Sequence, residues 1–259
     1  MSLFGQDRSF LDALSSQDRT ALLASGSPHA YAPNETVLRE GENSTFVLVI
    51  LSGWSVVSVE TERGARLILA LRGAGEVIGD LAAVDQRPRS ATVTALGALD
   101  GVVVPGPQFR GFLASRPAAT SLIMRQLSSR LRSADVERRS LASGTVLQRL
   151  AARLLELVER TGSRDPEGVA VNLPLPQHEL AAAVSATREA VAKALRLLRE
   201  EDVVRTGHRR LVVTNMPLLR LLAGGQAQPQ RRRAQEKSPG GQEKSPGAQE
   251  NSPESPPGV

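Results

Sequence analysis

The sequence predicts an α+β protein in which a small antiparallel β-structure, a long helix and a winged helix-turn-helix follow one another along the chain. Three observations carry this prediction. Short runs rich in Val, Ile and Leu, separated by glycines, extend from about residue 33 to residue 104. Uninterrupted helical periodicity follows Pro117, and two short helical patterns with a strand pair come near the C-terminus. Short, regularly spaced strands are typical of a β-barrel or sandwich.

Length and composition set the outer limits. A chain of 259 residues and 27.6 kDa has room for two modest domains. It contains no Cys, which excludes disulfides, thiolate zinc sites and cysteine-ligated iron–sulfur clusters. The 32 Lys and Arg against 27 Asp and Glu give a net charge of +5, so nucleic acid is a candidate partner. Aromatic residues are only 3% of the chain, too few to favour a stacking platform for single strands.

Neither a secretory signal nor a membrane span is predicted. Asp7 and Arg8 fall where the apolar stretch of a signal peptide would lie. The longest uncharged stretch, 43–59, is too short and too polar to cross a bilayer. We interpret it as two strands joined by a turn, and we expect a cytoplasmic protein without membrane contact.

We expect four segments with different roles. They are a β-rich domain at 1–116, a long helix at 117–142, a winged helix-turn-helix domain at 143–222 and a tail at 223–259. The tail is rich in Pro, Gly and Ser and repeats the motif Gln-Glu-Lys-Ser-Pro-Gly, so it cannot bury a core and should be disordered. A solvated linker is the favoured interpretation of the tail, and a basic arm that clamps DNA is the alternative.

The long helix carries a narrow apolar seam that suits one partner helix. Its members recur at steps of three, four or seven, with Arg138 as the one polar intrusion. Two interpretations stay open: the seam packs on the β-rich domain, or it pairs with a second copy of the chain. The seam residues are Ile123, Leu127, Leu131, Ala134 and Leu141. A second helix, expected at 146–160, repeats an apolar pattern and ends before Pro166.

The segment 75–92 contains residue types that suit a nucleotide-binding site, which we call the cradle. Gly79 precedes a short helical piece, where free backbone N–H groups can bind phosphate. Arg89 adds a forked donor for phosphate oxygens and Ser90 a hydroxyl. Asp80 would repel phosphate and is better suited to accept a hydrogen bond from a sugar hydroxyl. Phosphate and ribose together indicate a nucleotide; Arg89 as an ordinary surface cation is the alternative.

These motifs, taken in order, resemble the cyclic-AMP receptor (Crp-Fnr) family of bacterial transcription regulators. The resemblance covers roughly residues 10–215. It rests on Gly41-Glu42, the turn at Gly53, the cassette Ile78-Gly79-Asp80 with Arg89-Ser90-Ala91, and the C-terminal helix-turn-helix.

The resemblance implies a jelly-roll barrel of the cyclic-nucleotide-binding kind, a dimerisation helix and a winged DNA-binding domain. It implies that Gly79, Asp80, Arg89 and Ser90 hold a cyclic nucleotide. It further implies a homodimer, double-stranded DNA as the main partner, and RNA polymerase as a second partner. No cofactor is required apart from the nucleotide.

Two departures from the family pattern bear on the ligand. The family prefers Glu where this chain has Asp80, whose shorter side chain weakens the grip on ribose. Counted without gaps from Pro117, the positions that face adenine hold Ala134, which cannot hydrogen-bond, and Asp135, an acceptor that suits the N–H groups of guanine. We therefore expect poor binding of cyclic AMP. For Asp135, an intrahelical pair with Arg138 or Arg139 is the favoured alternative.

The helix-turn-helix is expected between residues 177 and 199. Leu180, Ala183 and Val184 are buried, Ser185-Ala186 form the turn and Thr187 caps the second helix. Val191, Ala194, Leu195 and Leu198 face inward, which leaves a polar face for base edges and phosphates. The expected DNA contacts are Thr187, Arg188, Glu189, Lys193, Arg196 and, at the tip of the wing, His208, Arg209 and Arg210. A solvated face with a Glu189–Lys193 pair is the less favoured alternative.

The sequence thus predicts a sequence-specific DNA-binding regulator under the control of a nucleotide. Two alternatives remain: a regulator with a relic cradle that needs no ligand, and a cyclic-nucleotide-binding-like adaptor that acts through protein partners. No nucleophile elbow or phosphate-binding Walker loop is present, and the three His lack metal or triad spacing, so an enzyme is not expected.

Overall fold

The N-terminal half of the computed structural model is built from two four-stranded antiparallel sheets. The model describes residues 4, 8–62, 64–171, 177–207 and 210–224. The first sheet has the order β1-β8-β3-β6 and the second β2-β7-β4-β5, so these strands form two sheets rather than one closed barrel. The strands are β1 (Ser27–Tyr31), β2 (Thr36–Leu38), β3 (Val47–Ser52), β4 (Ser55–Glu60), β5 (Arg66–Arg72), β6 (Val77–Ile78), β7 (Thr92–Ala95) and β8 (Leu99–Val104).

The two sheets share one apolar core, as in a sandwich. Leu48, Ile50 and Leu99 of the first sheet and Val93 and Ala95 of the second belong to the same buried cluster. Successive side chains of a strand point to opposite faces of its sheet, so the strands that contribute to this core do so with one face. The predicted β-rich domain is therefore confirmed as an antiparallel two-sheet structure.

The predicted pair of strands within 43–59 is confirmed, with each strand in a different sheet. β3 leads into β4 through Gly53, whose φ of +85° is the left-handed conformation that glycine adopts at little cost. A Cβ atom there would lie 2.3 Å from the carbonyl oxygen of Ala98. Glycine is required at this turn because the chain changes sheets against a neighbouring backbone.

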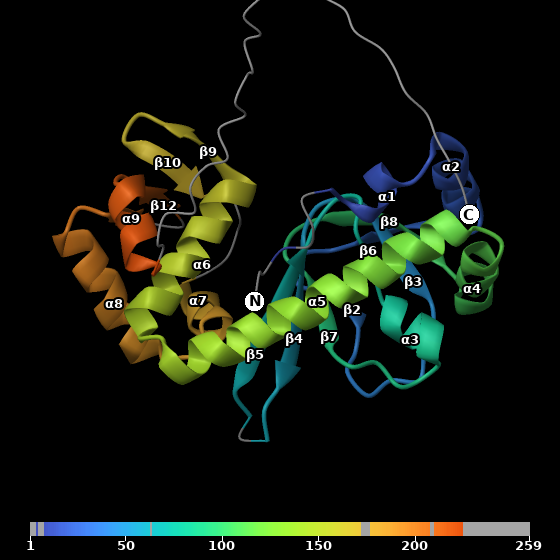
Figure 1. Cartoon of the computed structure of the whole chain (residues 1–259), viewed down its shortest axis with the longest axis horizontal. Coiled ribbons are helices and arrows are strands. Elements are labelled where there is room, and N and C mark those ends of the chain that lie inside the picture. Colours follow the sequence, from blue (N-terminus) through green and yellow to red (C-terminus); the bar gives the residue numbers. More distant parts are fainter. Residues whose placement is uncertain (1–3, 5–7, 63, 172–176, 208–209, 225–259) are drawn as a thin grey trace, which may run out of the picture. The chain divides into compact units, whose positions relative to one another are not determined.

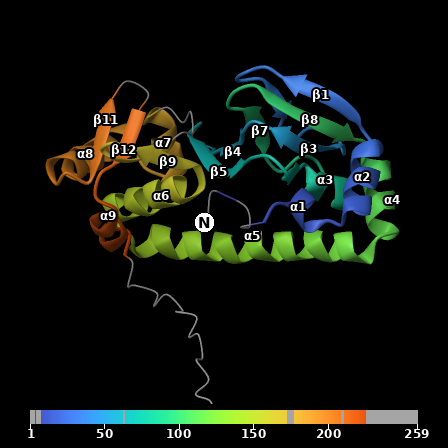
Figure 2. The same ribbon diagram turned by 90° about the horizontal axis from the view of Figure 1, so that it is seen from above.

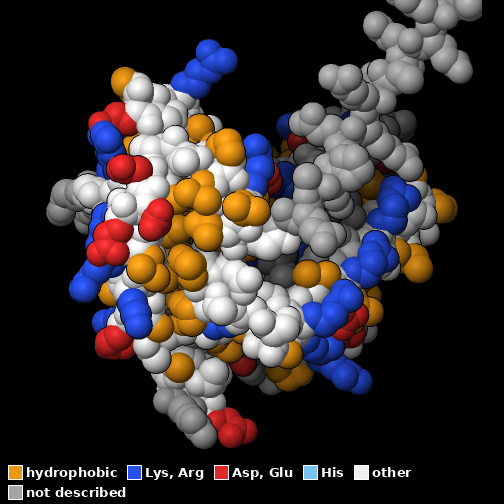
Figure 3. Space-filling view, turned by 60° about the vertical axis from the view of Figure 1, so that its left-hand side comes forward, with side chains coloured by type: hydrophobic (Ala, Val, Ile, Leu, Met, Phe, Trp, Pro, Cys, Tyr) orange, Lys and Arg blue, Asp and Glu red, His pale blue; other side chains and the backbone are white. Residues whose placement is uncertain are grey.

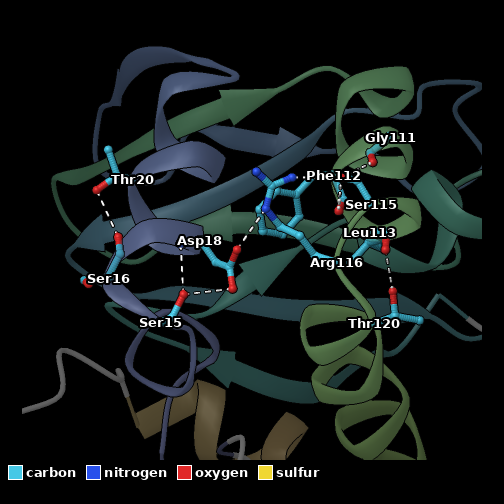
Figure 4. A network of polar contacts seen from close by, with 10 residues as sticks. All are labelled: Ser15, Ser16, Asp18, Thr20, Gly111, Phe112, Leu113, Ser115, Arg116 and Thr120. Atoms are coloured by element: carbon cyan, nitrogen blue, oxygen red, sulfur yellow. Dashed lines mark hydrogen bonds and ion pairs between the residues drawn. The ribbon is translucent and has the colours of Figure 1, made fainter.

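Short helices surround this core. They are α1 (Phe10–Ala13), α2 (Ser16–Ala24), α3 (Asp80–Asp85) and α4 (Gly106–Ala114). Of these only α3, the short helical piece after Gly79, was predicted from the sequence. Figure 4 shows how α2 is tied to the start of the long helix: Arg116 Nε donates to Asp18 at 2.9 Å, and the guanidinium lies over the ring of Phe112. The network anchors the long helix at its N-terminal end.

The long helix α5 (Pro117–Ser143) runs beside the N-terminal sheets and their helices in both ribbon views (Figures 1 and 2). The predicted apolar seam divides between two roles. Ile123 is buried and Leu127 packs against the same core as Phe109 of α4. Leu131 and Leu141 are 63% and 44% exposed. Packing on the chain's own core thus accounts for the first half of the seam only.

The C-terminal half is a winged helix-turn-helix. Thr145 and Gln148 form a capping box that starts α6 (Val146–Thr161). A four-stranded sheet of order β11-β12-β10-β9 follows. Its members and the remaining helices are β9 (Gly162–Asp165), β10 (Gly168–Val171), α7 (Gln177–Ala183), α8 (Arg188–Glu200), β11 (Val204–Gly207), β12 (Arg210–Val213) and α9 (Met216–Leu222).

The predicted second helix and the predicted wing strands are confirmed, whereas the hairpin of β9 and β10 was not predicted. Its strands are short and their side chains are at most half-buried, so they lack the apolar alternation that signals a strand. Among the described helices, none has a stretch both long and apolar enough to cross a bilayer.

Candidate ligand cavity and nucleic-acid interface

A cavity of about 190 Å³ lies between the second sheet, α3 and α5. Its walls are largely apolar, with Leu38, Val57, Ile78 and Val93 among the side chains that line it. Its polar lining comes from four separate stretches of the chain: Arg72, then Gly79, then Arg89 with Ser90, and finally Gln126, Ser129, Arg130 and Ser133 of α5. Three of the four predicted cradle residues, Gly79, Arg89 and Ser90, therefore meet at one cavity.

Gly79 makes room for Arg89. It lies directly before α3 with a φ of +82°, and a Cβ atom there would lie 2.6 Å from Nη1 of Arg89 and 2.9 Å from the carbonyl oxygen of Phe46. Any larger residue would displace the arginine or strain the backbone. The glycine is thus explained by the packing of the predicted phosphate donor.

Arg89 is buried rather than a surface cation, so that alternative is wrong. Its guanidinium donates to Ser44 Oγ at 2.9 Å, to the carbonyl of Gly79 at 3.0 Å and to the carbonyl of Phe46 at 2.7 Å. It also lies 4.8 Å from the ring centroid of Phe46. Burial lowers the pKa of Arg89 below its usual range. A phosphate would have to draw it away from these partners.

Asp80 is engaged with the long helix. Its carboxylate, 4% exposed, accepts from Nη1 of Arg130 at 3.0 and 2.9 Å. The oxygen atoms predicted to meet a ribose hydroxyl therefore face a cation of α5. The sequence analysis missed Arg130 because nothing local to the cassette identifies which turn of a distant helix lies opposite it.

Arg72 adds a second buried cation that the sequence analysis missed. Burial lowers the pKa of Arg72, and the nearby charge of Arg130 lowers it further. Arg72, Arg89 and Arg130 all line the cavity. Their neighbouring carboxylates lie outside its lining: Asp80 beside Arg130, Glu76 beside Arg72 at 3.6 Å, and Glu42 near Arg89. A lining with arginines as its charged side chains favours an anion.

The structure does not bring Asp135 to the cavity of its own chain. Its side chain is 53% exposed and accepts from Nη1 of Arg138 at 3.0 Å, the alternative favoured from the sequence. A helix turns by roughly 100° per residue, so residues two positions apart point in nearly opposite directions. Since Ser133 faces the cavity, Asp135 cannot. The ungapped count from Pro117 therefore gives the wrong residues for the lining of this cavity.

Polar contacts link α5 and the second sheet to the helix-turn-helix. Arg153 of α6 pairs with Glu137 of α5 at 3.5 Å and donates to the carbonyl of Ala183 at the end of α7 at 3.1 Å. Arg66 of β5 donates to Glu179 of α7 at 2.5 Å. A displacement of α5 would therefore change the contacts that hold α7 in place.

The helix-turn-helix follows the predicted pattern of burial. Leu180, Ala183 and Val184 are buried, and so are the inward residues of α8. Thr187 accepts from the backbone N–H of Ala190 at 3.2 Å and so caps α8, as predicted. The turn contains Ser185 at a φ of +50°.

The opposite face of α8 is exposed and charged. Arg188, Glu189, Lys193 and Arg196 are all exposed. Within the part of the chain that the structure describes, the three cations form no hydrogen bond or ion pair. The N-terminal backbone amides of α8 and the Thr187 hydroxyl lower the pKa of Glu189. Figure 3 shows a row of Lys and Arg side chains on the right-hand side of the molecule, hydrophobic side chains near the middle, and a mixture of Lys, Arg, Asp and Glu on the left.

The base of the wing is held by ion pairs. Arg210 donates to Asp165 of β9, which raises the pKa of Arg210 and lowers that of Asp165. Arg205 donates to Glu167 at 2.5 Å. Arg210 is thus already paired, whereas His208 and Arg209 lie outside the described residues.

Comparison of the sequence with models of known protein families identifies both the N-terminal sheet domain and the C-terminal helix-turn-helix. A family model described as the cyclic nucleotide-binding domain matches residues 28–116, and one described as the Crp-like helix-turn-helix domain matches residues 148–222. The first covers the two sheets and the cavity cassette. The second covers α6 to α9.

Among curated proteins, the chain is similar to two transcriptional regulators. The CRP-like cAMP-activated global transcriptional regulator of Mycobacterium tuberculosis is 30% identical over 168 residues, which cover 65% of this chain and 75% of the relative. The cAMP-activated global transcriptional regulator CRP of Haemophilus influenzae is 24% identical over 187 residues, 71% of this chain and 83% of the relative.

Solved structures support the same fold. The c-di-GMP responsive global regulator CLP of Xanthomonas campestris superposes with a TM-score of 0.71 at 20% identity, over 78% of this chain and 100% of that one. FixK2 from Bradyrhizobium japonicum gives 0.68 at 20% identity, over 78% and 99%. Family members are regulators and not enzymes, and this chain, with its nucleotide-binding-type domain and its Crp-like helix-turn-helix, belongs to the Crp-Fnr family of DNA-binding transcription regulators.

Proposed function

We propose that this protein is a homodimeric regulator that reads a two-fold symmetric DNA site with α8 and responds to an anionic ligand in the cavity. Residues 1–116 would sense, 117–142 would dimerise and 143–222 would bind DNA, with 223–259 as an appended tail. One observation carries the DNA-binding half of the proposal: α8 buries one face and presents on the other exposed cations that pair with none of the described residues.

Each residue of the exposed face has a role that its chemistry suits. Arg188 can fork onto the O6 and N7 atoms of guanine, and Glu189, ionised at neutral pH, can accept from the N4 of cytosine. Lys193 and Arg196, further along α8, can reach guanine or phosphate. Thr187, Arg210 and the neighbouring His208 and Arg209 would contact phosphates. The protein would act in the cytoplasm, and RNA polymerase would be its partner on the promoter.

Selection of bound duplexes from a random pool tests the DNA proposal. The wild type should enrich a palindrome. The Arg188→Ala variant should lose about 1–3 kcal/mol of the binding free energy that discriminates between bases at one base pair of each half-site, without losing affinity for random DNA. Arg199→Ala is the matched control, since Arg199 lies on the same helix but bonds to Thr206. Absence of any enriched sequence would contradict the proposal and favour the adaptor alternative.

The ligand half of the proposal rests on the cavity. Three arginines line the cavity and favour an anion, and the resemblance of the cassette to the family pattern favours a cyclic phosphate. Two relatives are named as cAMP-activated, which supports a cyclic nucleotide as the class of ligand. Cyclic AMP itself should bind poorly because the side chain of Asp80 is short and its carboxylate is already paired with Arg130.

Calorimetric titration with cyclic AMP, cyclic GMP and cyclic di-GMP tests this half. We expect weak binding, with a dissociation constant of tens to hundreds of micromolar for cyclic AMP. The Ser90→Ala variant should lose this binding. Ser90 is preferable to Arg89 for this test because Arg89 also supports the fold through three internal hydrogen bonds. If none of the three binds at millimolar concentration while DNA is still recognised, the protein is the ligand-independent regulator instead.

A further inference from the structure

The face of α5 that points away from the cavity carries a regular seam with no partner in the single chain. Its positions alternate in steps of three and four and are all exposed: Ser121, Met124, Ser128, Leu131, Asp135, Arg138 and Ala142. Met124 and Leu131 are each 63% exposed, more than any other large apolar side chain of α5. Steps of three and four are the spacing with which one helix packs along another.

This seam is distinct from the one predicted from the sequence. At roughly 100° per residue, it lies about half a turn around α5 from the cavity-lining residues Gln126, Arg130 and Ser133. It also lies to one side of Ile123, which packs into the chain's own core. The exposed seam shares Leu131 and Arg138 with the predicted one, and near its C-terminal end it has the carboxylate of Asp135 in place of Ala134.

Within the homodimer proposed above, we propose that Asp135 of each copy pairs with Arg138 of the other across the two-fold axis between the two α5 helices. This inference rests on the homodimer proposed above and adds the residues that decide its pairing. A two-fold interface between parallel helices places each seam residue beside its own counterpart. The helices must be parallel, because each α5 leads into a helix-turn-helix and both must reach one DNA site.

Charge complementarity identifies the occupant. Two Asp135 side chains brought together would repel each other unless cations lay next to them, and the Arg138 layer follows one turn later, about 4.5 Å along the axis. The intrahelical bond uses only Oδ1 of Asp135 and Nη1 of Arg138. The second carboxylate oxygen and the remaining guanidinium N–H groups are thus available to the partner, and a closed ring of four charges results.

The rest of the seam suits close approach of two helices. Ser121 and Ser128 are small, while Met124 and Leu131 supply the apolar contacts. The helix pair is therefore apolar near the sheets and ionic near the helix-turn-helix. It follows that the end of the pair next to the DNA-binding domains responds to salt, whereas the end next to the cavity does not.

Disulfide trapping tests whether a second copy covers the seam at all. The chain has no Cys, so a single introduced Cys reports without background. Leu131→Cys in the full-length protein should form a disulfide-linked dimer under mild oxidation, because the two residues face each other across the axis. Ser133→Cys, which faces the cavity, should stay monomeric on a non-reducing gel. Equal cross-linking of both, or none at Leu131→Cys, would overturn the placement and with it the proposed dimer.

Charge reversal tests the ion-pair layer itself. Asp135→Arg, which brings four cations together, and Arg138→Asp, which brings four anions together, should each weaken the dimer at least about tenfold in sedimentation velocity at low salt. The double swap, Asp135→Arg with Arg138→Asp, should restore most of the affinity. Glu40→Arg and Arg19→Asp make the same changes of charge at exposed positions off the seam and should have no effect.

Mixing the two single variants gives the sharpest outcome. Asp135→Arg and Arg138→Asp, each weakly dimeric alone, should form a heterodimer tighter than either homodimer, because one copy then brings two positive charges and the other two negative charges to the layer. If the wild type dimerises and Leu131→Cys is trapped, yet the single reversals dimerise normally, the dimer stands and the ion-pair layer is wrong. A swap that fails to restore affinity, with both proteins folded by circular dichroism, also overturns the pairing.

Discussion

On α8 the cations that are predicted to meet DNA form no hydrogen bond or ion pair with the described residues, whereas in the cavity the charged groups that are predicted to meet a ligand are bonded to the protein itself. Arg188, Lys193 and Arg196 extend into solvent. Arg89 donates three internal hydrogen bonds, and Asp80 is paired with Arg130.

This difference in bonding between the exposed cations and the cavity charges implies different ways to regulate the two sites. The DNA-binding face needs no rearrangement before contact, so its activity depends on where α8 is held. The cavity must exchange internal partners for ligand atoms, and one of those partners belongs to α5. A ligand that takes Asp80 from Arg130 would act on the helix that leads to the DNA-binding domain. Contacts that differ between the two states are what a ligand needs to shift a population.

The first and largest expected effect concerns the buried face of α8. Leu195 is fully buried, and Leu195→Ala should lower the free energy of unfolding by about 2–5 kcal/mol through lost contacts and a cavity. Chemical denaturation followed by circular dichroism measures the change. Leu197 lies on the same helix but is 42% exposed, so Leu197→Ala should change the free energy of unfolding by no more than about 0.5 kcal/mol. Equal effects would mean that α8 does not divide into a core face and a free face.

The second prediction concerns the structural role of the cavity cation. Arg89→Ala removes the donor from two carbonyls and one hydroxyl and should destabilise the protein by about 1–3 kcal/mol even without ligand. Thermal or urea unfolding measures it, with the exposed Arg87→Ala as control. An Arg89→Ala variant as stable as the wild type would show that the internal bonds contribute nothing and that the cavity is as free as α8.

The third prediction concerns the link between the cavity and α5. In a double-mutant cycle, Asp80→Ala and Arg130→Ala should show a coupling energy of about 1 kcal/mol, within the 0.5–3 kcal/mol usual for groups in contact. The same cycle with Arg132, an exposed neighbour on α5, should give none. Additive effects for Asp80 and Arg130 would remove the contact through which we expect a ligand to act.

The smallest effect concerns Arg210, a predicted DNA contact that is paired with a carboxylate of the protein, as the cavity residues are. Asp165→Asn frees Arg210 and should raise the affinity for random duplexes a few-fold and steepen its salt dependence by up to about one ion. Asp85→Asn removes the same charge outside the DNA-binding domain and serves as control. Unchanged binding would show that Arg210 does not reach phosphate.

The lowered pKa of Asp165 gives this prediction a pH signature. A carboxyl whose pKa is lower in the folded than in the unfolded protein stabilises the fold at pH values above its unfolded pKa, and this is lost as the pH falls through its folded pKa. The pair with Arg210 should therefore persist across the neutral range and open only in acid. Filter binding of wild type and Asp165→Asn should differ at pH 7 and converge in acid.

The sequence alone determined the helix-turn-helix and its two faces. The burial of Leu180, Val191 and Leu198 follows from spacing within single helices, and the cap at Thr187 follows from one hydroxyl and a backbone N–H three residues on. The alternation of apolar runs and glycines, followed by helical periodicity, likewise predicts the order of strands, long helix and winged domain. These features depend on neighbours in the chain, and the physics of helices and turns is local.

Tertiary structure decided the partners of the cavity and the use of α5. Arg72, Arg89 and Arg130 meet only because two sheets and a helix come together, and no local pattern states which turn of α5 lies opposite Asp80. The same packing buries Ile123 and exposes Met124, which moves the free seam around the helix. A periodic sequence shows that a helix has faces, but only the packing of distant segments determines which face is already covered.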